Sequence, residues 1–156
     1  MKIVVGADPW GLGLKNVVKD HLKENGHEVI DVGGLSADDN VPYYAAAATA
    51  AQKIQQGEAE RGVLFCGTGM GVAITANKFK GVYAGVIESE FTAKMCKAVN
   101  NANVLTMGSM VVTPHIAKLA VDAWLGTKHT EGLEEHKEFL RTAVNEIAGI
   151  EEANMK

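Results

Sequence analysis

Short β-branched segments alternate with longer helical segments along almost the whole chain, and this alternation limits the possible folds more than any other feature. The strand-like segments are nearly continuous in apolar residues, which is typical of parallel strands covered on both faces. Five strands are predicted, at residues 2–6, 28–32, 61–66, 82–86 and 103–107. Helices are predicted at residues 12–25, 43–56, about 72–80, 89–98, 114–126 and 133–149.

Strands that alternate with helices form a parallel sheet, because each right-handed crossover lays a helix on one of its faces. Gly26 and Gly57 are expected to end the first two helices as C′ residues. Thr113 and Pro114 predict an N-cap followed by a first helical residue. Since no linker or repeat interrupts the pattern, we expect one α/β domain over residues 1–156, with an arm-like C-terminal helix at about residues 131–150.

Composition excludes several classes of function. The net charge of −4 and the pI near 5.7 argue against nucleic-acid binding, which needs a basic surface. The sequence contains no apolar run long enough to cross a membrane and no signal peptide, so a cytoplasmic protein is expected. Its two cysteines, Cys66 and Cys96, are expected to be free thiols, and its five histidines lack metal-ligand spacing. Neither a metal nor a cofactor is expected.

Three loops at the predicted carboxyl ends of strands carry chemically useful residues, and ligands of open parallel sheets bind at this edge. They are residues 6–11, 66–71 and 100–103. In the second loop Gly67, Gly69 and Gly71 precede a predicted helix, so their amides could converge on a phosphate or an oxyanion. A tight turn without function is an equally good interpretation, and dinucleotide binding is weaker because this loop follows the third strand.

Cys66 adds weight to the functional interpretation of that loop. An anion-attracting turn should favour the thiolate, which could act as a base or a nucleophile, although a free cysteine is more often a buried apolar residue. Cys96 has no such surroundings and is expected in the core. Asp8 could accept hydrogen bonds from sugar hydroxyls or could cap a helix. Asn100 could bind hydroxyls or could simply turn the chain.

These motifs together resemble the B-type ribose-5-phosphate isomerases and the related galactose-6-phosphate isomerase subunits. The resemblance extends to about Gly126 and rests on Gly6-Ala7-Asp8, Cys66-Gly67-Thr68-Gly69-Met70-Gly71, Ala76-Asn77-Lys78 and Asn100-Asn101-Ala102-Asn103-Val104-Leu105 followed by Gly108-Ser109. It implies a three-layer α/β/α sandwich with a five-stranded parallel, Rossmann-like sheet, an extra C-terminal helix, and sites at a dimer interface.

The resemblance also implies the reaction, an aldose–ketose isomerisation of a phosphorylated sugar, of the ribose-5-phosphate or galactose-6-phosphate type. Cys66 would move a proton between C1 and C2 through a cis-enediolate, and Thr68 would assist. The amides from Gly67 to Gly71, Met70 included, would hold the enediolate oxygen. Asp8 and Asn100 would contact substrate hydroxyls.

The chain departs from this family pattern at the positions that open the sugar ring and bind the phosphate. Pro9 and Val99 replace histidines, and Leu133 and Lys137 stand where arginines are expected. Lys137 and Arg141, one helical turn apart, are the remaining candidates for the phosphate, although a solvated helix face explains them as well. If they bind it, they should reach into a neighbouring subunit.

These departures leave several functions open. The first is an isomerase of a phosphorylated sugar of about four to six carbons, working as a homodimer or homotetramer. An isomerase of an unphosphorylated or open-chain short sugar is the second. The third is a subunit active only beside an arginine-bearing homologue, as in galactose-6-phosphate isomerase, whose B subunit shares the cysteine loop and the arginine-poor tail. A non-catalytic sugar-phosphate-binding subunit is disfavoured, because it would not need Cys66 and Thr68.

Overall fold

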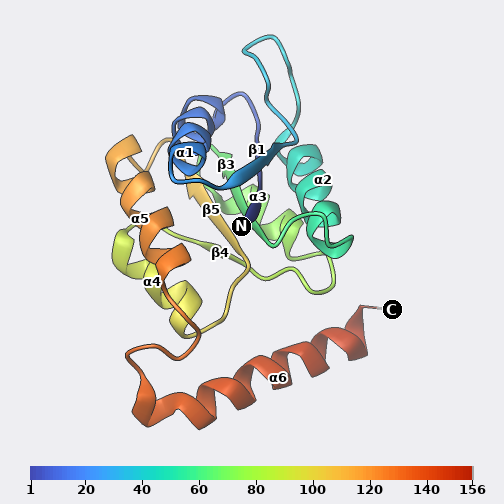
Figure 1. Ribbon diagram of the computed structural model, residues 1–156. Helices are drawn as coiled ribbons and strands as arrows, with labels where there is room; N and C mark the ends of the chain where they lie inside the picture. The colour runs from blue at the N-terminus through green and yellow to red at the C-terminus, as the bar shows by residue number, and fades with distance from the viewer. Residues whose placement is uncertain (156) are drawn as a thin grey trace.

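A computed structural model of the chain describes residues 1–155 and confirms the predicted fold class, with a parallel sheet between two layers of helices (Figure 1). All its strands run parallel, in the order β2-β1-β3-β5-β4. The strands are β1 (Lys2–Ala7), β2 (Glu28–Asp31), β3 (Arg61–Cys66), β4 (Ala84–Val86) and β5 (Val104–Gly108). The helices are α1 (Leu12–Glu24), α2 (Tyr43–Gln55), α3 (Met70–Ala76), α4 (Glu90–Ala98), α5 (Pro114–Gly126) and α6 (Lys137–Asn154), the last preceded by a 3₁₀ turn η1 (Glu134–His136).

Alternate residues of the central strands enter two separate cores, because successive side chains of a strand point to opposite faces. Val63 and Phe65 of β3 pack with α1, α4 and α5, where Trp124 is the largest buried side chain. Leu64 and Cys66 of the same strand pack with the alanine-rich helix α2 and with α3. The side chain of Cys66 therefore leaves the sheet on the α2–α3 face.

The order of the strands creates a switch point between β1 and β3, since the chain leaves β1 toward β2 and returns on its other side to form β3. Ala7 pairs with Phe65, so Asp8 and Cys66 occupy the next step of the same ladder. Cys66 also pairs with Gly108 of β5. The loops after β1, β3 and β5 therefore meet at one edge of the sheet, where ligands of open parallel sheets bind.

The predicted helix ends at Gly26, Gly57 and Thr113 are confirmed. Gly26 and Gly57 have φ of 84° and 72°, a conformation that glycine adopts without strain, and their amides donate to the carbonyls of Lys23 and Ile54. Thr113 caps α5 by accepting a hydrogen bond from the amide of Ile116.

Three predicted elements have boundaries that differ from the structure by two residues or more. Helix α3 ends at Ala76 rather than Lys80, because the side chain of Asn77 binds both backbone groups of Ala84. Strand β4 starts at Ala84 rather than Val82, since the amide of Tyr83 donates to the Asn103 side chain. The last helix starts at Lys137, after the 3₁₀ turn, and continues through Gly149 to Asn154.

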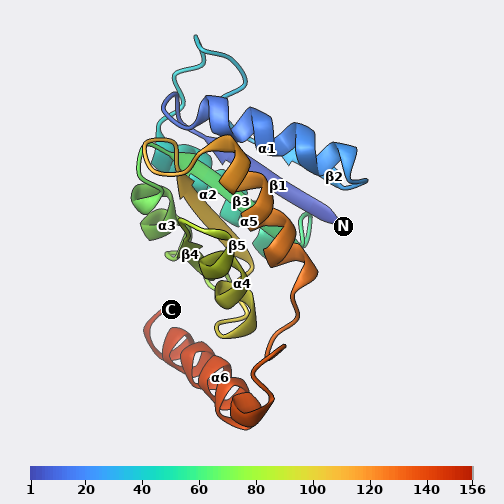
Figure 2. The same ribbon diagram turned by 90° about the vertical axis from the view of Figure 1, so that its left-hand side faces the viewer.

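Helix α6 lies apart from the two helical layers, at one end of the molecule (Figures 1 and 2). Leu140, near its start, is its one buried residue. Near its end, two carboxylates hold it to the body: Glu151 accepts hydrogen bonds of 2.9 Å from both the Tyr83 hydroxyl and the Gly81 amide, and Glu152 pairs with Lys80 at 2.6 Å. Along the part of the chain that the structure describes, no helix is long and apolar enough to cross a membrane.

A buried lysine fixes the beginning of the long loop between β2 and α2. The side chain of Lys15, on α1, is fully buried, and its Nζ lies 2.8 Å from both carboxylate oxygens of Asp31. The same ammonium donates to the backbone carbonyls of Gly33 and Gly34. Lys19 also pairs with Asp31 but is partly exposed. The Asp31 carboxylate and the two carbonyls therefore supply acceptors for all the hydrogen atoms of the buried ammonium, and the carboxylate balances its charge.

Lys15→Met should therefore destabilise the protein far more than Lys19→Met, although both lysines bind the same carboxylate. Loss of Lys15 removes the buried ammonium that binds Asp31 and the Gly34 carbonyl and leaves only the partly exposed Lys19 beside the carboxylate, at a cost of about 2 kcal/mol or more. Loss of the outer partner should cost about 1 kcal/mol or less. Urea denaturation of the two variants measures the difference, and equal losses would contradict this account.

Candidate active site

A hollow of about 320 Å³ lies at the switch point, at the carboxyl ends of β1 and β3. We call it the cysteine pocket, and the segment from Cys66 to Gly71 the cysteine loop. Its volume is at the small end of the range for small-molecule pockets. The residues that line it are Asp8, Trp10, Tyr43, Cys66, Gly67, Thr68, Gly71 and Met110.

Cys66 is the last residue of β3 and is 5% exposed. Its Sγ accepts a hydrogen bond from the amide of Gly69, with a nitrogen–sulfur distance of 3.1 Å. The chain turns back toward the sulfur because Gly69 has φ of 81°, a left-handed conformation. A donor aimed at the sulfur stabilises negative charge on it, as a thiolate base requires.

Two glycines of neighbouring loops allow the backbone to approach this site closely. A Cβ on Gly108 would lie 2.4 Å from the carbonyl carbon of Thr68, and one on Gly11 would lie 2.5 Å from that of Phe65. Both distances are too short for any side chain. The loops after β5 and β1 therefore pack directly on the end of β3 and hold Cys66 between them.

Asp8 and Thr68, both predicted site residues, line the cysteine pocket with Cys66. Asp8 is 7% exposed, and its Oδ1 accepts a 2.9 Å hydrogen bond from the amide of Gly11, so it stabilises the start of α1. Among the described residues its other carboxylate oxygen has no hydrogen-bond partner and can receive a ligand. Thr68 is exposed, and its hydroxyl accepts from the amide of Met70 at 3.3 Å.

The cysteine pocket has no cationic side chain of its own. Asp8 supplies the only acidic side chain among its lining residues, and none of them is lysine, arginine or histidine. Within one chain, polar contacts to a ligand can come from the loop amides, the hydroxyls of Thr68 and Tyr43, and the Asp8 carboxylate. An anionic part of a ligand needs positive charge from another place.

The sequence analysis missed three side chains of this pocket: Trp10, Tyr43 and Met110. Trp10 and Met110 closely follow the carboxyl ends of strands, so their positions in the sequence could have indicated that they line the pocket. Tyr43 comes from the first residue of α2, and only the three-dimensional path of the loop before it brings it here. Gly71 was an indirect signal, because a Cβ there would lie 2.6 Å from the Tyr43 ring.

Asn100, a predicted substrate-binding residue, does not line the cysteine pocket. It is exposed and borders a separate hollow of about 320 Å³ between the sheet edge and α6, together with Cys96, Val144 and Ile147. Burial raises the pKa of the Cys96 thiol to about 11, so this cysteine is a neutral thiol at neutral pH. Cys96 also packs against the core, as predicted.

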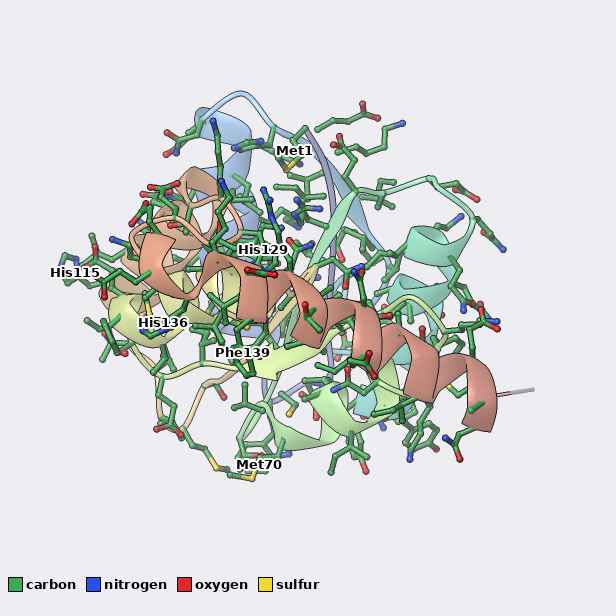
Figure 3. The ribbon with its side chains drawn as sticks, turned by 90° about the horizontal axis from the view of Figure 1, so that it is seen from below. Met1, Met70, His115, His129, His136 and Phe139 are labelled. Carbon is green, nitrogen blue, oxygen red and sulfur yellow. The ribbon has the colours of Figure 1, made fainter. Side chains whose placement is uncertain are left out.

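Lys137 and Arg141 share a surface groove on α6, which confirms that they lie on one face of the helix. The groove also contains Glu134, Glu135 and Glu138, so carboxylates surround both cations. Figure 3 shows His136 and Phe139 at the start of this helix, and Met70 of the cysteine loop at a separate edge of the molecule. A single chain does not bring these cations to Cys66, and Met70, 54% exposed, points away from the pocket.

Across residues 1–155, no three histidine, cysteine, aspartate or glutamate side chains cluster in a way that could hold a metal ion.

Comparison with known proteins gives a consistent family assignment. The family profile described as Ribose/Galactose Isomerase matches residues 3–142. A 4-deoxy-4-sulfo-D-erythrose isomerase of Clostridium sp. (strain MSTE9) is 47% identical and aligns over 98% of this chain and 97% of its own length. A D-erythrulose-4-phosphate isomerase 2 of Mycolicibacterium smegmatis is 41% identical over 81% of this chain and 84% of its own.

Comparison with solved structures leads to the same family. The structure of ribose-5-phosphate isomerase B from Clostridium thermocellum superposes with a TM-score of 0.89 at 37% identity, covering 98% of this chain and 99% of that one. The family profile covers the cysteine loop, the Asp8 loop and the start of α6. The chain therefore belongs to the ribose/galactose isomerase family and is an enzyme of the aldose–ketose isomerase class.

Proposed function

We propose that this isomerase acts on an open-chain sugar of four carbons that carries a terminal anion, with 4-deoxy-4-sulfo-D-erythrose as the best candidate. One observation carries the proposal: no histidine, the residue that the resemblance implies for opening a sugar ring, lines the cysteine pocket. Pro9 and Val99 stand where the resemblance implies histidines. A substrate that is never cyclic would not need them.

Sugars of this kind cannot close a five-membered ring, because the oxygen that would close it is missing or blocked. In 4-deoxy-4-sulfo-erythrose a sulfonate group on C4 replaces the C4 hydroxyl, and in erythrose 4-phosphate that hydroxyl is esterified. The relatives at 47% and 41% identity carry names of four-carbon substrates of these two kinds. Ribose 5-phosphate differs, since its C4 hydroxyl is free to form a furanose.

In the proposed reaction Cys66 is the base. Its thiolate removes the proton from C2 of the aldose, the C–H electrons form a C1=C2 double bond, and the carbonyl electrons move to O1. The thiol then returns the proton to C1 while the O2 hydroxyl loses its proton to O1, which leaves a carbonyl at C2. The net change moves one proton between carbons and one between oxygens, so no oxidant or cofactor takes part.

The cysteine loop would stabilise the negative charge that develops on the enediolate. The amide of Gly69 donates to the sulfur, and the amide of Met70 donates to the Thr68 hydroxyl. Thr68, which lines the pocket beside Cys66, would carry the proton between the two oxygens. Preorganised donors of this kind are often the largest contribution to catalysis of acyl and enolate chemistry.

The terminal anion would be bound by Lys137 and Arg141 of a second subunit, since one chain cannot bring them to its own pocket. Three glutamates surround these cations. A sulfonate carries one negative charge and a phosphate close to two, so the weaker donor set favours the sulfonate. We propose a homodimer or homotetramer in the cytoplasm, where a reducing medium keeps Cys66 a free thiol. A hetero-oligomer with an arginine-bearing homologue is the alternative arrangement.

The Cys66→Ala variant should lose almost all exchange of the C2 proton with solvent deuterium. Removal of a general base lowers the rate by about 10² to 10⁴. Proton NMR in deuterium oxide measures the exchange, and near-normal exchange would remove Cys66 from the mechanism. Cys96→Ala is the matched control and should exchange normally, because its thiol is not ionised near neutral pH.

The purified enzyme should turn over 4-deoxy-4-sulfo-D-erythrose and D-erythrose 4-phosphate with a higher kcat/KM than D-ribose 5-phosphate. The physical reason is that only the pentose must first open a ring. Coupled or NMR assays of the three sugars give the comparison. A preference for ribose 5-phosphate would contradict the proposal, and activity that appears only with an added homologue would indicate the hetero-oligomer.

Lys137→Ala combined with Arg141→Ala should raise the KM for the sulfonated sugar by roughly 10- to 100-fold, because each lost charge-assisted hydrogen bond weakens binding. The uncharged analogue 4-deoxy-D-erythrose, also open-chain, should be turned over as before. Lys128→Ala, an exposed lysine outside this groove, is the control. If the double variant binds both sugars normally, the anion is bound elsewhere.

A further inference from the structure

Three large side chains, an indole, a phenol and a thioether, line the cysteine pocket, and the proposed proton transfer does not use them. Trp10 follows β1, Met110 follows β5, and Tyr43 begins α2. They are exposed by 66%, 63% and 41% respectively, so they add little to the core. Exposed aromatic residues gathered at a pocket usually contact a ligand or a partner.

The three side chains cover the outer side of the cysteine loop. A Cβ on Gly67 would lie 3.4 Å from Cε of Met110 and 3.9 Å from Cβ of Trp10. One on Gly71 would lie within 3.0 Å of three atoms of the Tyr43 ring. The pocket space above Cys66 is therefore bounded by the loop on one side and by these side chains on the other.

This wall is held in place by contacts outside the pocket. The Ser109 hydroxyl donates a 2.7 Å hydrogen bond to the backbone carbonyl of Trp10, and Gly11 packs on Phe65 directly behind it. Tyr43 follows Pro42, whose restricted backbone begins α2, and meets the ring of Tyr44 edge-on at 5.5 Å. Side chains on fixed backbone can discriminate between ligands by size.

We propose that Trp10 and Tyr43 are specificity-determining residues that limit the sugar to four carbons, with Met110 completing the wall. The inference deepens the proposed function and rests on it. A chain one methylene longer would press its terminal group against the rings. In a closely fitting apolar pocket one methylene changes kcat/KM by about 10- to 200-fold.

The test uses two substrates that differ by one methylene and cannot cyclise: D-erythrose 4-phosphate and the corresponding 4-deoxypentose 5-phosphate. In the wild-type enzyme kcat/KM should favour the shorter sugar by roughly tenfold or more. Trp10→Ala and Tyr43→Ala should each reduce that preference by a similar factor, and Trp10→Phe should reduce it less. Phe91→Ala is the control, an aromatic residue exposed by 68% that does not line the pocket.

The outcomes separate the two proposals. A wild-type enzyme that prefers ribose 5-phosphate overturns the proposed function. If the wild type prefers the four-carbon sugar and both alanine variants keep the same preference, only the proposal that Trp10 and Tyr43 set the chain length is overturned. Sedimentation of each variant is the second measurement. If the oligomers of these variants dissociate and lose activity equally on both sugars, the proposed role in specificity is overturned. The side chains would then belong to a contact between subunits.

Discussion

Backbone packs against backbone around Cys66, and the site depends on this contact. Gly108 and Gly11 leave no room for a side chain where the loops after β5 and β1 meet the end of β3. The left-handed Gly69 then turns the loop so that its amide reaches the sulfur. Because the donors belong to the backbone, their positions are set by the sheet register and cost little reorganisation when charge develops. The geometry of the cysteine loop is therefore a property of the fold itself.

The sequence was sufficient to predict the loops that carry Asp8 and Cys66. It was insufficient to predict the other side chains of the pocket. Strand periodicity placed Asp8 and Cys66 at the same edge of the sheet, and the spacing of the glycines identified the loop that follows Cys66. Tyr43 was missed because its place depends on the path of a long loop, which periodicity does not describe. The end of α3 was misplaced because the Asn77 side chain binds a strand seven residues later, a contact invisible to helix propensity. Asn100 and Lys137 stay predictions, since neither side chain lines the cysteine pocket of its own chain.

Helix α6 makes few contacts with the rest of its own chain. It is held to the body mainly at its two ends, by Leu140 and by Glu151, with a hollow of about 320 Å³ beneath its middle. Phe139 and Ile150 are exposed by 70% and 63% and have no apolar cover in one chain. A helix with so little contact to its own body is suited to contact another one. The charged groove of α6 and the apolar wall of the cysteine pocket would then meet only after assembly.

The ammonium of Lys15 has a consequence for how this protein can be altered. It binds the carbonyls of Gly33 and Gly34, so the root of the loop before α2 is fixed independently of its tip. The tip, from Leu35 to Asp38, is exposed and makes few contacts with the body. Loop tips of this kind accept insertions well. A fluorophore-bearing peptide or an affinity handle could be grafted there, a place from which the enzyme can be attached to a surface without disturbing its catalytic edge.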